Sequence, residues 1–64
     1  MKDKELQELS EKILKYRASH NLSAEKFASM CKLTTPTVYN IENAKAAPSK
    51  ITLHKILNVI EREE

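Results

Sequence analysis

Two short helical segments separated by a few residues occupy the middle of this 64-residue chain. The first, LSAEKFA over residues 22–28, contains Ser23, a residue type that caps helix starts well. The second, TTPTVYNIENAK over residues 34–45, opens with two threonines that can cap it and with Pro36, whose missing N–H does no harm in a first helical turn. The pattern predicts two short helices, the first over about residues 24–31, joined by a tight turn.

A longer amphipathic helix is predicted on each side of this pair. Residues 3–20 carry a stripe of mostly apolar side chains at helical spacing: Leu6, Leu9, Ile13, Leu14, Arg17 and Ala18. Residues 50–62 carry a second stripe: Leu53, Ile56, Leu57 and Ile60. The chain has no glycine and few β-branched runs, which argues against a sheet. The sequence therefore predicts one all-α domain over residues 1–64, with four helices and a helix-turn-helix unit at about residues 23–43.

The positive charge of the chain is concentrated in its middle. Residues 1–14 hold three lysines and four acids, a net −1, and residues 56–64 hold Arg62 and three glutamates, a net −2. Residues 15–55 hold six lysines and Arg17 against two glutamates, a net +5 within the overall +2. A basic face around the helix-turn-helix pattern indicates a polyanionic partner, although an ordinary solvated surface can carry the same charge.

Several other classes of function lack the residues they need. The single cysteine, Cys31, cannot form an internal disulfide, which favours a reducing, cytoplasmic setting and a role in packing. His20, His54 and Cys31 have no ligand spacing, and a chain without glycine has no phosphate-binding loop. We therefore expect no catalytic residue, metal, cofactor or small-molecule effector site. No apolar run approaches the roughly 20 residues of a membrane span, and the charged N-terminus is unlike a signal peptide.

The central segment carries two landmarks at a matched spacing, the pair LS at residues 22–23 and the run IENAK at residues 41–45. With them, residues 14–60 resemble the helix-turn-helix family of phage Cro and repressor proteins, also called the XRE family. The resemblance implies a lambda-repressor-like fold, double-stranded DNA as the partner, and a prokaryotic or phage-encoded, nucleoid-associated protein. The chain departs from the family in its longer first helix and in the absence of the usual fifth helix.

The resemblance implies roles for the second short helix and its surroundings. Thr35, Pro36 and Asn40 match base-reading positions, with Tyr39 beside them. Their chemistry suits this role, because Asn can pair with adenine and Thr or Pro can touch a thymine methyl. Without the family pattern, solvated surface would be the better interpretation of the same polar face. The expected phosphate contacts are Ser23, Ala24, Thr37, Asn43 and Lys45, with Lys26 and Lys32 added from their charge alone.

The resemblance also implies one structural ion pair and three unusual turns. Arg17 falls where the family often has an arginine that pairs with a glutamate at the position of Glu42, so a pair between two helices is expected. Glycine is common in the family at the positions of Asn21, Lys32 and Ala44. Asn tolerates the left-handed conformation, whereas the other two imply altered or mildly strained turns.

The apolar face of the last helix would lack the cover of a fifth helix. Leu53, Leu57 and Ile60 are therefore expected at a homodimer interface, unless Leu6 and Leu9 cover them within one chain. The predicted function is sequence-specific regulation of transcription, as a repressor on a pseudo-palindromic operator. Two alternatives stay open. One is a protein-interaction module, such as an antitoxin-like or regulator-binding subunit that binds DNA weakly or only in complex; the other is a small helical domain without a DNA role.

Overall fold

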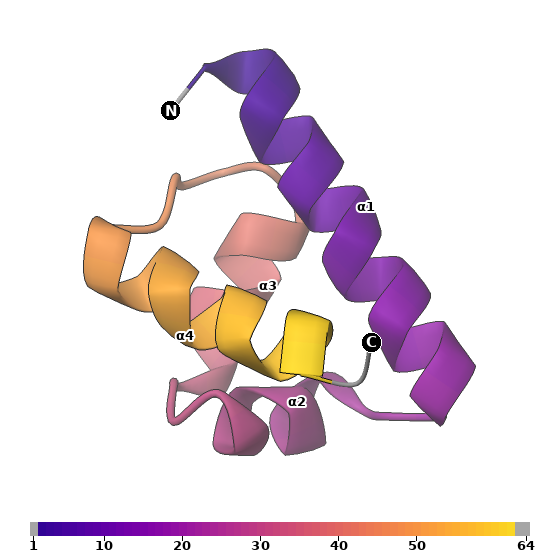
Figure 1. Cartoon of the computed structure of the whole chain (residues 1–64). Coiled ribbons are helices and arrows are strands. Elements are labelled where there is room, and N and C mark those ends of the chain that lie inside the picture. Colours follow the sequence, from indigo (N-terminus) through magenta and orange to yellow (C-terminus); the bar gives the residue numbers. More distant parts are fainter. Residues whose placement is uncertain (1, 63–64) are drawn as a thin grey trace.

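The computed structural model describes residues 2–62, which form four α-helices and no strand (Figure 1). The helices are α1 (Asp3–His20), α2 (Ala24–Met30), α3 (Thr35–Glu42) and α4 (Lys50–Arg62). The prediction of an all-α fold is confirmed, and α1 and α4 have the predicted bounds. The helix α2 is one residue shorter than predicted, because Cys31 is already its C-cap.

The longest helix, α1, runs along one side of the molecule, and the other three pack beside it (Figure 1). The helix α3 packs against both α1 and α2, while α4 crosses the front of the view and contacts α1. One hydrophobic cluster draws on all four helices, and its buried members are Leu6, Leu9, Ile13, Tyr16, Phe27, Ala28, Cys31, Val38, Ile41 and Ile56. The two short helices depend on this packing, since isolated helices of their length are marginal in water.

The buried face of α1 differs from the predicted stripe. Leu14 is 46% exposed and Ala18 is also exposed, so the prediction that these two widen the stripe is wrong. Leu14 lies about 100° round the helix from the centre of the buried face, because successive residues are about 100° apart. The core contains Tyr16 instead, and its ring meets that of Phe27 edge-on, with 5.8 Å between the ring centroids.

The ends of α1, α2 and α3 share one backbone arrangement. Each helix is followed by a residue with positive φ, namely Asn21 (54°), Lys32 (60°) and Ala44 (56°). The N–H of the next residue then donates to the carbonyl oxygen five residues earlier, at 2.8 Å in all three cases. This is the Schellman motif, in which glycine is usual at the positive-φ position. The strained turns expected at Lys32 and Ala44 are therefore present.

The helix α4 is only partly covered. Among its apolar residues Ile56 is buried, while four others contact the core cluster and stay partly exposed: Leu53, Leu57, Val59 and Ile60. Leu6 and Leu9 of α1 are buried in the same cluster. The N-terminal half of α1 thus contributes to the core that α4 packs on, although it leaves part of the apolar face of α4 exposed.

Candidate nucleic-acid interface

Two buried side chains determine which side of α3 faces solvent. Val38 is 0% exposed and Ile41 is 2% exposed, and both belong to the core that α3 shares with α1 and α2. The residues on the other side are exposed: Pro36, Tyr39, Asn40 and Asn43. The residues predicted to read bases therefore lie at the surface, with the exception of Thr35, which is partly buried.

The exposed face of α3 is polar but carries no charged side chain of its own. It offers the ring of Pro36, the phenol of Tyr39, which is 49% exposed, and the amide of Asn40. A side-chain amide holds a donor and an acceptor side by side, which is the pattern that adenine presents in the major groove. Neutral groups of this kind can discriminate between bases but add little electrostatic attraction to DNA.

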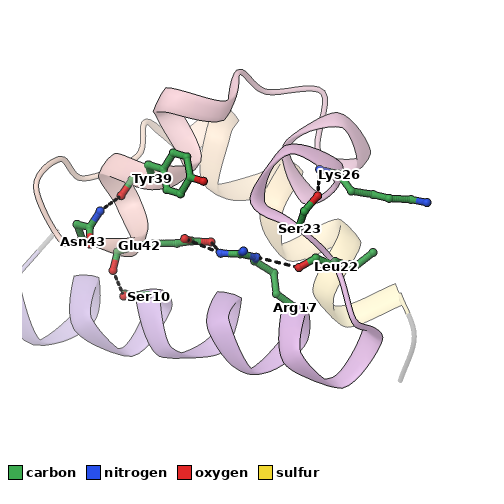
Figure 2. A network of polar contacts seen from close by, with 8 residues as sticks. All are labelled: Ser10, Arg17, Leu22, Ser23, Lys26, Tyr39, Glu42 and Asn43. Carbon is green, nitrogen blue, oxygen red and sulfur yellow. Dashed lines mark hydrogen bonds and ion pairs between the residues drawn. The ribbon is translucent and has the colours of Figure 1, made fainter.

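An ion pair fixes the C-terminal end of α3 to α1 (Figure 2). Nη1 of Arg17 donates to both carboxylate oxygens of Glu42 at 2.7 Å, and its Nε donates to the carbonyl oxygen of Leu22 at 3.2 Å. The Glu42 side chain is only 6% exposed, so the pair is shielded from water. The hydroxyl of Ser10 also donates to the backbone carbonyl oxygen of Glu42. The expected pair is thus present, and it links α1 both to α3 and to the segment before α2.

Two residues of this arrangement are not indicated by the apolar pattern of α1. Ser10 is buried and contacts Glu42, and Tyr16 is buried in the core. The available signal for Ser10 is its position seven residues, or about two turns, before Arg17, which places both side chains on the same side of the helix. For Tyr16 the signal is its place three residues after Ile13, on the same helical face.

The starts of α2 and α3 are capped in different ways. The Ser23 hydroxyl accepts from the Lys26 N–H at 3.1 Å, as expected for a serine cap. Thr34 is the N-cap residue of α3, but its hydroxyl pairs with that of Thr37 at 2.7 Å and bonds no helix N–H. Ala24 is only 2% exposed. The expected phosphate contact at Ala24, through backbone N–H groups at the start of α2, stays a prediction.

The other candidate phosphate contacts lie on α2, in the turn and at the end of α3. Lys26 on α2, Lys32 in the turn and Lys45 after α3 are all exposed. Asn43 uses its side-chain N–H to bond the Tyr39 carbonyl oxygen at 2.9 Å, so it also closes the end of α3 (Figure 2). The amide has a second N–H, which a phosphate oxygen can accept.

The thiol of Cys31 belongs to the core rather than to a reactive site. It is 2% exposed, and burial raises its pKa from 9.0 to about 11. A thiol with this pKa stays protonated at neutral pH, and the thiolate that acts as a nucleophile does not form. Within residues 2–62, no group of three side chains is placed to hold a metal ion, and no helix is long and apolar enough to cross a membrane.

Two short helices joined by a tight turn, the second of which exposes a polar face, are the arrangement of helix-turn-helix DNA-binding proteins. A family model described as helix-turn-helix matches residues 13–64. The chain therefore belongs to the helix-turn-helix family of the Cro and XRE type, and it is in this general sense a DNA-binding transcription regulator. No curated protein and no solved structure matches the chain significantly.

Proposed function

We propose that this protein is a sequence-specific repressor that binds a pseudo-palindromic operator as a homodimer, in the cytoplasm of a prokaryote or as a phage product. The observation that carries the proposal is the exposed face of α3. Pro36, Tyr39 and Asn40 lie at the surface of a helix whose other side is held in the core by Val38 and Ile41. The proposed activity is binding alone, with no catalytic step and no cofactor.

Asn40 is the residue proposed to read a base directly. The amide N–H can donate to N7 of adenine while the amide oxygen accepts from the N6 amino group, which together make a bidentate contact. Thr35 and Pro36, at the start of α3, supply apolar contacts for a thymine methyl, and Tyr39 flanks them. Because the side chain of Pro36 cannot donate a hydrogen bond, part of the sequence preference is assigned to DNA shape and deformability.

The phosphate contacts are assigned to the residues around α3. Lys26, Lys32 and Lys45 are exposed and can each neutralise a phosphate, which releases condensed counterions and gives affinity for any duplex. The hydroxyls of Ser23 and Thr37 and the amide of Asn43 are proposed as further phosphate contacts. Each of these groups also makes a hydrogen bond within the protein, so their contribution is expected to be smaller than that of the lysines.

A homodimer is proposed because one α3 helix covers only a half-site. Helix-turn-helix dimers present two recognition helices about 34 Å apart, one helical turn of DNA, on the same side of the duplex. The partly exposed apolar face of α4 supplies the dimer contact, with Leu53, Leu57 and Ile60 as its members. Two-fold symmetry of the protein then demands a pseudo-palindromic operator.

The experiment that tests the proposal is selection of preferred duplexes from a random pool by the purified protein. We expect an enriched motif made of two inverted half-sites whose centres are about 10 base pairs apart. The matched control is the same selection with Asn40→Ala, which should lose preference at one base pair of each half-site. Recovery of unenriched sequences by the folded wild-type protein would reject a sequence-specific regulator.

A second candidate function is a module that binds another regulator or a toxin and contacts DNA only in that complex. The observation that favours it is the combination of a neutral outward face on α3 with four partly exposed apolar residues on α4. Under this alternative, the isolated protein fails the selection, and the complex purified with its partner passes it.

A further inference from the structure

A groove of about 410 Å³ lies between α1 and α4. The apolar part of its lining comes from Tyr16 of α1 and from Leu57 and Ile60 of α4. The two α4 residues contact the core cluster but stay partly exposed, so part of their apolar surface borders the groove. A chain of this length has a small core, and apolar surface left beside a groove indicates that a partner covers it.

The groove carries opposite charges on its two walls. Lys12 and Lys15 come from α1, and Glu61 comes from α4. All three side chains are exposed, and the one ion pair in the described part of the chain joins Arg17 and Glu42. When a surface meets its own copy across a two-fold axis that runs along the groove, each wall faces the opposite wall of the other protomer. In that orientation, a patch with a basic wall and an acidic wall is complementary to itself.

We propose that this groove is the surface on which a second copy of the chain docks, with Lys12 and Lys15 of one protomer facing Glu61 of the other. The inference rests on the homodimer of the proposed function. It adds α1 to an interface otherwise assigned to α4 alone, and it names the charged residues that set the pairing.

A second copy suits the groove better than other occupants do. An acidic peptide or a nucleic acid is attracted by the two lysines but repelled by Glu61. A basic segment is attracted by Glu61 but repelled by the two lysines. An apolar small molecule leaves both walls without ionic partners. The same surface on a second protomer supplies both signs of charge and also covers Leu57 and Ile60.

A stable dimer needs a contact area larger than the groove itself. A standard interface buries about 800 Å² on each partner, which is roughly one sixth of the 4626 Å² surface of this chain. The groove provides only part of that area. The partly exposed Leu53 lies one turn before Leu57 on the same side of α4, so the contact extends naturally in that direction.

Docking at the groove leaves the candidate DNA surface open. No residue of α2 or α3 lines the groove, and α3 lies behind α4 in Figure 1. A dimer formed through α1 and α4 therefore keeps Tyr39 and Asn40 of each protomer exposed.

The test is sedimentation equilibrium of the full chain without DNA, at micromolar concentration. The variants are Glu61→Lys and the double variant Lys12→Glu/Lys15→Glu, each measured alone and then mixed in equal amounts. Lys55→Glu is the matched control, because Lys55 is exposed on α4 but does not line the groove. Circular dichroism shows whether each variant keeps its helices, which surface charge changes should not disturb.

We expect the wild type and the Lys55→Glu control to be dimeric. Each groove variant should raise the dimer dissociation constant at least tenfold, and the mixture should regain dimers because the reversed charges again face opposite signs. A monomeric wild type would overturn the inference, and so would a dimer whose dissociation constant is unchanged in the groove variants. Selection of DNA sites is measured separately, so a monomer that still selects a DNA sequence removes this inference and leaves sequence-specific binding in place.

Discussion

At the scale of single residues, the side chains that α3 exposes differ in kind from those around them. The face itself holds the neutral side chains of Tyr39 and Asn40, whereas the exposed lysines come from neighbouring segments: Lys26 on α2, Lys32 in the turn and Lys45 after α3. Neutral groups can discriminate between base edges, and lysines attract any phosphate backbone. Substitutions in these two groups should therefore differ in whether their effect depends on DNA sequence.

The first prediction concerns Asn40→Ala. If Asn40 pairs with adenine, the variant should lose about 1–3 kcal/mol of binding free energy for the selected site and lose preference at a single base pair. Competition binding against duplexes changed one position at a time measures both effects. Asn58→Ala, a change of the same type at an exposed position on α4, should leave binding unaltered. Equal weakening for every duplex would reassign Asn40 to the phosphate backbone.

The second prediction concerns the strained turn after α3. Ala44 has a φ of 56°, a region where a Cβ atom is unfavourable. Ala44→Gly should stabilise the fold by about 0.5–1 kcal/mol. This net gain is the backbone strain that glycine relieves, reduced by the greater conformational entropy that glycine gives the unfolded chain. Thermal unfolding should show this as a rise in Tm of a few degrees, on the order of 4 °C. Ala46→Gly, at a position without positive φ, should lower the Tm instead.

The third prediction concerns pH and the buried thiol of Cys31. Burial raises its pKa from 9.0 to about 11, so the unfolded chain releases this proton first as the pH rises. The stabilisation is therefore complete below pH 9.0 and is lost progressively as the pH approaches about 11. The loss should be about 2 kcal/mol. Urea unfolding across this range measures it, and Cys31→Ala should show a smaller alkaline decline than the wild type. Parallel curves would mean that the thiol is not the cause.

At the scale of elements, the ion pair between Arg17 and Glu42 is what joins α1 to the end of α3. Because the Glu42 side chain is 6% exposed, removing its partner leaves a carboxylate that is poorly solvated and unpaired. Arg17 also bonds the Leu22 carbonyl oxygen, so a single side chain positions both ends of the helix-turn-helix unit (Figure 2). The orientation of α3 depends on this pair together with the burial of Val38 and Ile41.

The fourth prediction is therefore that Arg17→Ala acts on stability. The loss should be about 3 kcal/mol, a large share of the free energy of unfolding of a domain this small. Urea unfolding measures the loss, and Lys4→Ala, an exposed change on the same helix outside the groove, is the control. DNA affinity per folded molecule should fall much less. A variant with normal stability and weak DNA binding would show that Arg17 contacts phosphate instead.

The helices themselves were predictable because their signals are local. Caps, the proline at the start of α3 and apolar periodicity give the bounds of α1 and α4, and Ser23 acts as the predicted cap. The side of a helix that faces the core is less local, since it depends on where the neighbouring helices lie. Spacing alone placed Leu14 inside and left out Tyr16, although only the packing of α1 against α3 and α4 decides between them.

The candidate site was predictable in part. The exposure of Pro36, Tyr39 and Asn40 follows from the burial of Val38 and Ile41, which the sequence pattern indicates. The burial of Ala24 does not follow from its sequence position. It arises because the start of α2 is packed into the fold, which no pattern within α2 reveals.

At the scale of the whole molecule, the candidate DNA surface and the proposed dimer surface lie on different helices. The candidate DNA surface comes from α2, the turn and α3, while the groove proposed for the second protomer is lined by α1 and α4. This separation lets one surface meet DNA while the other meets a second protomer. The affinity of the dimer for DNA then depends on twice the number of lysines that one chain supplies.

The most direct measurement of the central claim is a salt titration of binding to random-sequence duplex DNA, compared between the wild type and a triple variant with Lys26, Lys32 and Lys45 changed to Gln. We expect the logarithm of the wild-type binding constant to fall linearly with the logarithm of salt concentration, at about 0.9 for each neutralised phosphate. The triple variant should bind more weakly and with a clearly shallower slope. Absence of wild-type binding at low salt, or identical slopes for the two proteins, would contradict a DNA surface built around α3.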